Sequence, residues 1–196
     1  NSMMAQDVVP SRLEKSKLLI ENLVDHFTHD RIGLVVFAGD AFVQLPITTD
    51  YVSAKMFLQN IDPSLVATQG TDIAKAINLS MRSFSQQKDI GKAVIVITDG
   101  EDHEGGALEA AKAANDKGVR VFILGIGSTK GAPIPLQEGG YLTDRNGQTV
   151  LTALNETMCK EIAQAGKGTY IHVDNTNDAQ EKLNDELAKL QRADTQ

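Results

Sequence analysis

A run of acidic and hydroxyl side chains follows the most apolar segment of the sequence. Residues 93–97 read Ala-Val-Ile-Val-Ile, and Thr98-Asp99-Gly100-Glu101-Asp102-His103-Glu104 comes directly after them. An apolar run without polar alternation is typical of a strand buried on both faces. Ligands of open parallel sheets bind beyond the carboxyl ends of the strands. Asp99 is therefore a candidate ligand-binding residue, because a carboxylate at the end of a buried strand needs a partner.

Two other segments place hydroxyl groups ahead of predicted helices. Thr71 follows Gly70 where a helix is predicted to begin, and Ser2 precedes the first helix of the chain. Hydroxyl and carboxylate oxygens, without imidazole or thiolate, suit Mg²⁺, Mn²⁺ or Ca²⁺ and not Zn²⁺. We expect Ser2, Thr71 and Asp99 to meet at one edge of a sheet and to hold such a cation. Taken singly, Thr71 is also explained as a helix N-cap and Asp99 as a turn residue.

The elements that must position these residues follow from the apolar pattern. Runs rich in β-branched residues alternate with helical periodicity, which indicates an α/β fold of three layers with a mostly parallel, Rossmann-like sheet. The Gly39-Asp40 pair predicts a two-residue type II′ turn, so that one antiparallel edge strand forms and ends at Pro46. Strands are predicted over 31–38, 41–45, 92–97, 119–126 and 169–173, and helices over about 11–27, 51–60, 71–84, 105–117, 156–165 and 177–192.

The length of 196 residues predicts a single domain over residues 1–196. Residues 131–151 hold two prolines, paired glycines and the sequence Asp144-Arg145-Asn146-Gly147. Asn-Gly is the preferred dipeptide of a tight hairpin turn. We therefore expect an inserted hairpin or loop over residues 131–151, turning at Asn146-Gly147.

Composition excludes several classes of function. The chain has 19 Lys plus Arg and 26 Asp plus Glu, a net charge of −7, and no basic stripe, so no nucleic-acid partner is expected. No apolar run approaches the ~18 residues of a membrane helix, and no signal peptide is recognisable, so the chain as given is expected to be soluble. The one cysteine, Cys159, is expected to be a core residue.

Signals for an enzyme are weak. The sequence from Gly125 to Gly131 satisfies neither the dinucleotide nor the P-loop fingerprint. No Gly-x-Ser-x-Gly elbow occurs, and His26, His29, His103 and His172 lack a nucleophile in a recognisable local signature. His103, on the same loop as Asp99, is weighed as a contact to the site or to a partner. We expect a binding protein and not an enzyme.

Three segments together resemble a known family. Asn1-Ser2-Met3, Gly70-Thr71 and Val94-Ile95-Val96-Ile97-Thr98-Asp99-Gly100-Glu101 are similar to the metal-ion-dependent adhesion site of von Willebrand factor type A domains, which is spelled Asp-x-Ser-x-Ser, then Thr, then Asp. Longer stretches over 37–51 and 131–135 resemble the Bat (Bacteroides aerotolerance) membrane proteins of the BatB type. The resemblance spans nearly the whole chain and assigns Ser2, Thr71 and Asp99 to the motif.

The resemblance also implies what is missing. The aspartate and first serine of the motif would precede Asn1, on a central strand between the predicted strands 31–38 and 92–97. The first central strand is thus truncated, and we expect residues before Asn1 in the native protein. Otherwise a segment of another chain, a swapped element or a rearranged sheet would fill the gap, and metal affinity would fall.

The function implied is a metal-dependent protein-binding module. An acidic side chain of a partner would complete the coordination of Mg²⁺, or of Mn²⁺ or Ca²⁺. By resemblance, the whole protein is held in the bacterial inner membrane by segments outside this chain, with the domain on the periplasmic side, and joins other Bat proteins and a MoxR-type ATPase. Two alternatives stay open: a Mg²⁺-dependent hydrolase or phosphoryl-transfer enzyme, and a scaffold that binds no metal because the motif is incomplete.

Overall fold

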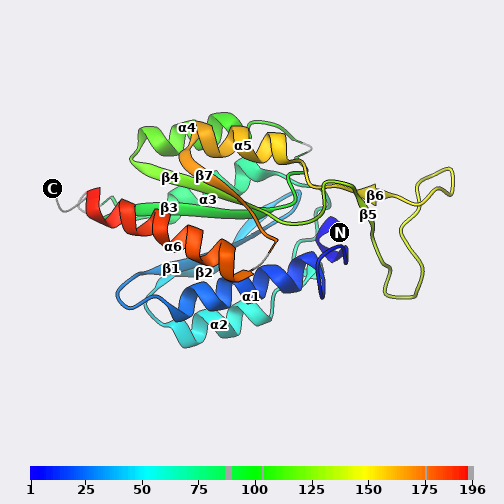
Figure 1. The fold of residues 1–196 in the computed structure, drawn as a ribbon, viewed down its shortest axis with the longest axis horizontal. Coiled ribbons are helices and arrows are strands. Elements are labelled where there is room, and N and C mark those ends of the chain that lie inside the picture. The colour runs from blue at the N-terminus through cyan, green and yellow to red at the C-terminus, as the bar shows by residue number, and fades with distance from the viewer. Residues whose placement is uncertain (87–89, 103, 175, 194–196) are drawn as a thin grey trace.

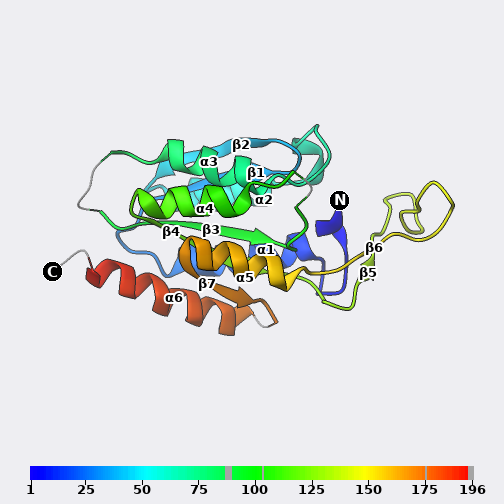
Figure 2. The ribbon, with the colours of Figure 1, turned by 90° about the horizontal axis from the view of Figure 1, so that it is seen from above.

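A computed structural model of the chain describes residues 1–86, 90–102, 104–174 and 176–193. Strands lie in a middle layer between two layers of helices (Figures 1 and 2). The strands are β1 (Ile32–Phe37), β2 (Ala41–Thr48), β3 (Lys92–Thr98), β4 (Val119–Gly125), β5 (Ala132–Pro133), β6 (Leu151–Thr152) and β7 (Lys167–His172). The helices are α1 (Arg12–Asp25), α2 (Tyr51–Gln59), α3 (Ile73–Ser83), α4 (Ala107–Asp116), α5 (Glu156–Ala165) and α6 (Thr176–Ala193), with short 3₁₀ turns at Ser2–Met4 and Pro63–Leu65. The predicted α/β class is confirmed.

The larger sheet is parallel, with the strand order β3-β4-β7. Its middle strand is covered on both faces, because alternate side chains of a strand point to opposite sides. Val121 and Ile123 pack under α3, α4 and α5, whereas Phe122 and Leu124 pack against α1 and α6. This two-sided burial explains why β4 carries no polar alternation.

β1 and β2 form a separate antiparallel pair. Within the described part of the chain, β1 pairs with β2 alone and β3 pairs with β4 alone. Each therefore has one strand edge outside any ladder, and these two strands are the ones between which the truncated central strand was expected. The mostly parallel sheet with an antiparallel edge is thus present in two pieces.

Two helices join the pieces. On one face, α1 packs between α2, which covers β1 and β2, and α6, which covers β7. On the other face, α3 contacts β1, β2 and β3 and also packs on α4. α1 begins where the Ser11 hydroxyl accepts a hydrogen bond from the Glu14 amide, which makes Ser11 the N-cap. The site described in the next section includes Arg12, the first residue of α1, and Thr71, which precedes α3.

The connection between β1 and β2 corrects two predictions. The strands close at Phe37 and Ala41 around three residues, and Gly39 has no positive φ, so the type II′ turn is wrong. Gly39 is needed for space, because a Cβ there would lie 2.3 Å from the Gln69 carbonyl oxygen. β2 also continues past Pro46 to Thr48, because Pro46 falls at a bulge in an edge strand, where a missing N–H is tolerated.

A long arm over residues 131–152 extends away from the body (Figures 1 and 2). Its base is the short ladder of β5 and β6, with Ala132 opposite Thr152. Beyond the base the chain makes two successive reversals. The first is held by the Leu136 amide bonding the Gly140 carbonyl, and the second by the Asp144 side chain accepting from the amides of Asn146 and Gln148.

Candidate metal centre

The three predicted ligands lie toward one end of the molecule. β3 ends at Thr98, so Asp99 begins the loop at the carboxyl edge of the parallel sheet. Figures 1 and 2 both place the chain's N-terminus at that end, beside the base of the arm. α3 starts there too, because a Cβ on Gly106 of the loop after β3 would lie 3.5 Å from the Cβ of Ala74. The N-terminus and the loop after β3 therefore lie toward one end of the molecule, with α3 packed near that loop. No hydrogen bond joins Thr71 to Ser2 or Asp99 among the described residues.

Asp99 is nearly enclosed, with a relative exposure of 3%. Its Oδ1 accepts a hydrogen bond of 3.2 Å from the Glu101 amide, and its Oδ2 accepts one of 3.1 Å from Nη1 of Arg12. Its carbonyl accepts from the Asn155 amide at the start of α5. The carboxylate is therefore fixed in place at the end of β3 and is not a loose turn residue.

Gly100 lets the chain leave the strand directly after Asp99. Its φ is +78°, and a Cβ there would lie 2.5 Å from the Asn155 carbonyl oxygen and 3.0 Å from Sγ of Cys159. Both the backbone conformation and the close approach of α5 require glycine. Gly100 thus fixes the path of the backbone after Asp99, and this path determines where the Asp99 carboxylate points.

Ser2 lies beside the Arg12 guanidinium that also contacts Asp99. Its carbonyl oxygen is 3.5 Å from Nη1 of Arg12, the nitrogen that also bonds Asp99. The Ser2 hydroxyl makes no hydrogen bond within the described residues, so it keeps its capacity to bind a ligand.

Thr71 lies one residue before the N-cap of α3. The cap is Asp72, whose side chain accepts from the Lys75 amide at 3.0 Å, so α3 begins at Ile73, two residues after the predicted start at Thr71. The Asp72 amide bonds the Ala38 carbonyl at 2.7 Å, which fixes Thr71 against the end of β1. The Thr71 hydroxyl makes no hydrogen bond to any part of the chain that the structure describes.

Sequence reasoning missed Arg12, the first residue of α1. This guanidinium is fully buried, and it bonds both carboxylate oxygens of Asp7 at 2.9 and 2.8 Å. It also reaches Asp99 and both the hydroxyl and the carbonyl of Thr152, each contact to Thr152 measuring 3.0 Å. A signal existed, because a cation in the first turn of a helix opposes the helix dipole and needs a separate reason.

The ion pair with Arg12 changes the acidity of its partners. Burial alone would raise the pKa of Asp7, but hydrogen bonds from the Arg12 guanidinium and from the Ser128 amide outweigh it and hold that pKa below 3.8. Burial likewise opposes the charge of Arg12, yet Asp7 and Asp99 raise its pKa. Asp7 and Arg12 are therefore both charged at neutral pH, and the Asp99 carboxylate faces the same guanidinium.

The donors at this rim fit a hard cation. No group of three or more His, Cys, Asp or Glu side chains that could hold a metal lies among the described residues, so an ion here would rely on hydroxyls beside Asp99. Within the same residues, Oδ1 of Asp102 is buried without a hydrogen-bond partner on the loop that carries Asp99. An orphaned carboxylate oxygen and two uncommitted hydroxyls match the oxygen preference of Mg²⁺, Mn²⁺ and Ca²⁺.

Among the described residues, the only thiol near Asp99 is unsuited to bind a metal. Cys159 is fully buried, as predicted, and burial followed by the nearby charge of Asp99 raises the pKa of its thiol to about 12. The thiolate needed for a nucleophile or a zinc ligand is therefore absent at neutral pH. His103 lies outside the described residues.

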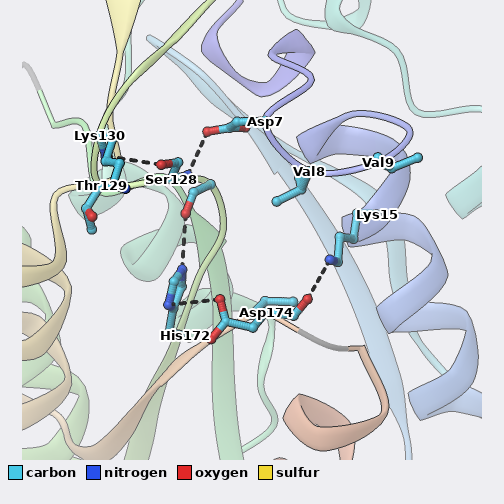
Figure 3. Close-up of a pocket in the computed structure, with 11 residues that line it drawn as sticks. Asp7, Val8, Val9, Lys15, Ser128, Thr129, Lys130, His172 and Asp174 are labelled. Carbon is cyan, nitrogen blue, oxygen red and sulfur yellow. Dashed lines mark hydrogen bonds and ion pairs between the residues drawn. The ribbon is translucent and has the colours of Figure 1, made fainter.

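A pocket of about 450 Å³ opens beside this cluster (Figure 3). Its walls come from the segment around Asp7, from Lys15 of α1, and from the loops that follow β4 and β7. The Lys15 ammonium bonds the Asp174 carbonyl at 2.8 Å, and Nε2 of His172 lies 3.1 Å from the Gly127 carbonyl oxygen. Asp7 belongs to both sites, since it bonds Arg12 on one side and the Ser128 amide at 2.6 Å on the other.

Fold and rim together define a class of protein. Residues 5–186 match the von Willebrand factor type A domain, and the chain belongs to that family. It is similar to the crystal structure of the conserved hypothetical protein BatB from Bacteroides thetaiotaomicron, with 58% identity, a TM-score of 0.94, and coverage of 97% of this chain and 94% of that one. An aerotolerance-related membrane protein from Bacteroides fragilis matches with 57% identity, a TM-score of 0.93, and coverage of 96% and 94%.

More distant relatives share the fold or part of the sequence. A structure of proximal thread matrix protein 1 from the mussel byssus, with a zinc-occupied metal-ion-dependent adhesion site, has 19% identity and a TM-score of 0.62, covering 88% of this chain and 41% of that one. A UPF0353 protein of Nocardia farcinica is 28% identical over 86% of this chain. The chain spans only part of the length of these curated relatives. It covers 54% of the Nocardia farcinica protein and 29% of the Escherichia coli protein YfbK. No helix among the described residues is long and apolar enough to cross a membrane.

Proposed function

We propose that this domain is a protein-binding module whose rim holds a divalent cation through Ser2, Thr71 and Asp99. A carboxylate from a partner protein completes the coordination. Mg²⁺ takes about six oxygen ligands, so three ligands from this chain leave positions for water and for the partner. Because the two hydroxyls are neutral, the ion keeps most of its charge and attracts an acidic side chain strongly. The module works by binding and needs no bond-breaking group.

The observation that carries this proposal is the convergence of Ser2 and Asp99 on one atom. The Ser2 carbonyl oxygen and Asp99 Oδ2 lie 3.5 and 3.1 Å from the same nitrogen of Arg12. Residues 97 positions apart in the sequence therefore lie beside the same guanidinium, and this proximity supports the proposal. The occupied site of the mussel-byssus protein supports the proposal at the level of the fold.

The neighbouring pocket favours an acidic partner. Lys15 and Lys130 line it, and neither has a carboxylate within ion-pair distance in the described chain. Asp7 and Asp174 line the same pocket, but Asp7 is already paired with Arg12, so the two lysines can contact an acidic partner in a protein whose net charge is −7. By similarity to the BatB-type and aerotolerance-related proteins, we propose other Bat proteins and a MoxR-type ATPase as partners. We place the domain on the periplasmic side of a bacterial inner membrane, held by segments outside this chain.

A second candidate is a scaffold that binds no metal. The observation favouring it is the ion pair between Asp99 and Arg12, since a guanidinium already supplies positive charge at the position of the ion. The two candidates differ in one measurable property, which is the affinity of the domain for Mg²⁺ and Mn²⁺.

The first prediction separates these candidates. Asp99→Asn keeps the shape of the side chain but removes its charge, and we expect it to lower the affinity for Mn²⁺ and Mg²⁺ in titration calorimetry by about a hundredfold or more. Glu109→Gln, an equally conservative change on the exposed face of α4, is the matched control and should bind as the wild type does.

The same two variants test the partner. Proteins recovered from native bacterial membranes on the immobilised wild-type domain should be released by a chelator, and the Asp99→Asn domain should not recover them. Equal binding of metal and of partner by wild type and Asp99→Asn would overturn the proposed function. Binding of the partner without metal would establish the scaffold.

A further inference from the structure

Arg12 is an unusual residue for its position in the fold. It is the first residue of α1, where the helix dipole is unfavourable to a cation, and its side chain is completely buried. Gly127 is packed against it, because a Cβ there would lie 2.6 Å from Nε of Arg12. A buried cation in such a position persists only when opposing charges and hydrogen bonds hold it.

The charges around Arg12 do not cancel. Asp7 binds the guanidinium with both of its oxygens and neutralises it alone. Asp99, at 3% exposure, then shares only the remaining nitrogen, Nη1, at 3.1 Å. One negative charge of this buried cluster is thus left without a full counter-charge, and the region has the electrostatic capacity for a second cation.

Nη1 is also the atom that an incoming ion would disturb. It bonds Asp99 Oδ2 at 3.1 Å and the Thr152 hydroxyl at 3.0 Å. A divalent ion that binds Asp99 Oδ2 takes the lone pair that Nη1 uses and repels the guanidinium. Because the guanidinium is planar and rigid, Nη1 leaves Asp99 only if the whole group turns, and the bidentate contact to Asp7 is the point about which it turns.

We propose that Arg12 is a built-in competitor for the ion at Asp99 and that it links occupancy of the rim to the base of the arm. The link runs through Thr152, the last residue of β6, which faces Ala132 across the base. The Thr152 hydroxyl accepts from Nη1 of Arg12 and donates to the Glu101 carboxylate at 2.7 Å. When the ion displaces Nη1 from Asp99, the hydrogen bonds at the base of the arm rearrange. This inference rests on the proposed function and names a positioning residue within it.

The test uses two substitutions with opposite expected effects. Arg12→Gln removes the competing charge, and we expect the Kd for Mn²⁺ and Mg²⁺ to fall at least about tenfold. Asp7→Asn leaves the competitor in place but frees it to turn fully to Asp99, so the Kd should rise several-fold. A general loosening of the rim would weaken ion binding in both variants, which makes the opposite signs diagnostic.

Thermal unfolding first checks that each variant is folded. Should Arg12→Gln fail to fold, Arg12→Lys replaces it, because lysine keeps one charge near Asp7 but cannot span Asp7 and Asp99 together. Hydrogen exchange of residues 131–152 supplies a readout besides affinity. Exchange there should change when Mn²⁺ is added to the wild type and should not change in Thr152→Val.

The outcomes separate this inference from the proposed function. Ion binding by the wild type that depends on Asp99, with equal or weaker binding by folded Arg12 variants, overturns the inference and leaves the proposed function standing. Ion binding by an Arg12 variant alone supports the inference and overturns the proposed function for the wild-type chain. No binding by any variant overturns both.

Discussion

Asp99 and Arg12 bring a carboxylate and a guanidinium into direct contact at the site where we propose that an ion binds. The carboxylate lies at the end of the parallel sheet with both oxygens engaged, one by the Glu101 amide and the other by Arg12. Its burial makes an uncompensated charge costly, so positive charge must be present from a guanidinium, from an ion, or from both. The hydroxyls of Ser2 and Thr71 distinguish these cases, because only an ion can use them as ligands.

Asp7 leads to a prediction about pH. Its pKa is held below the ordinary 3.8 by Arg12 and Ser128, so the folded state binds its proton less readily than the unfolded chain does. The resulting stability is complete above about pH 4 and is lost as the pH falls through the lowered pKa. Asp7→Asn should therefore lower the free energy of unfolding at pH 7 by about 1–3 kcal/mol and reduce its decline between pH 4 and pH 2.

Urea unfolding at pH 7, 4, 3 and 2 measures this effect. Asp50→Asn is the control, because Asp50 also has a lowered pKa, through hydrogen bonds from Ser53, but its carboxylate is fully exposed at the start of α2. The control should change the acid decline less than Asp7→Asn does. An equal decline in the wild type and Asp7→Asn would show that the Arg12 contact contributes no pH-dependent stability.

Two glycines explain how the elements reach the rim. Gly39 admits the backbone of residues 68–69 against the end of β1, and Gly100 admits the start of α5 against the end of β3. Residues 68–69 precede α3, and Asn155 precedes α5. Each glycine therefore fixes the end of a strand against the segment that leads into a helix. The loops of the rim are thus positioned by backbone contacts and not by side-chain packing alone.

Gly100 provides the prediction for these elements. Alanine there would adopt a φ of +78° and place its Cβ 2.5 Å from the Asn155 carbonyl oxygen. We expect a loss of roughly 3 kcal/mol or more in the free energy of unfolding, together with weaker ion binding because Asp99 shifts. Gly105→Ala is the matched control, since its φ of +74° is similar but no atom lies within 4 Å of the added Cβ.

The control should cost only about 1–2 kcal/mol and leave ion binding unchanged. Denaturant unfolding and calorimetry on the two variants measure both quantities. Equal losses would show that backbone conformation alone, and not the approach of α5, requires glycine at position 100.

In the molecule as a whole, the rim is formed by segments that adjoin two separate groups of strands. The β1–β2 pair and the β3-β4-β7 sheet share no ladder among the described strands, and α1 and α3 hold them together. Arg12 starts α1 and Thr71 precedes α3, so the two helices that join the pieces also carry residues of the site.

Part of this organisation was predictable from sequence and part was not. The end of β3 was visible because an apolar run stops at an acidic loop, a pattern contained within about ten residues. The role of Arg12 was not visible, because its partners Asp99 and Thr152 lie 87 and 140 residues away and meet it only in the folded chain. Gly39 was misinterpreted for the same reason, since the backbone that requires it belongs to residue 69.

Anomalous diffraction from crystals of this domain equilibrated with Mn²⁺ would locate the ion itself. We expect one peak at the rim, about 2.1–2.3 Å from a carboxylate oxygen of Asp99, with the hydroxyls of Ser2 and Thr71 turned toward it and the guanidinium of Arg12 turned away from Asp99. A map without a peak at millimolar Mn²⁺, or with a peak that contacts none of these three residues while Arg12 still bonds Asp99, would contradict it.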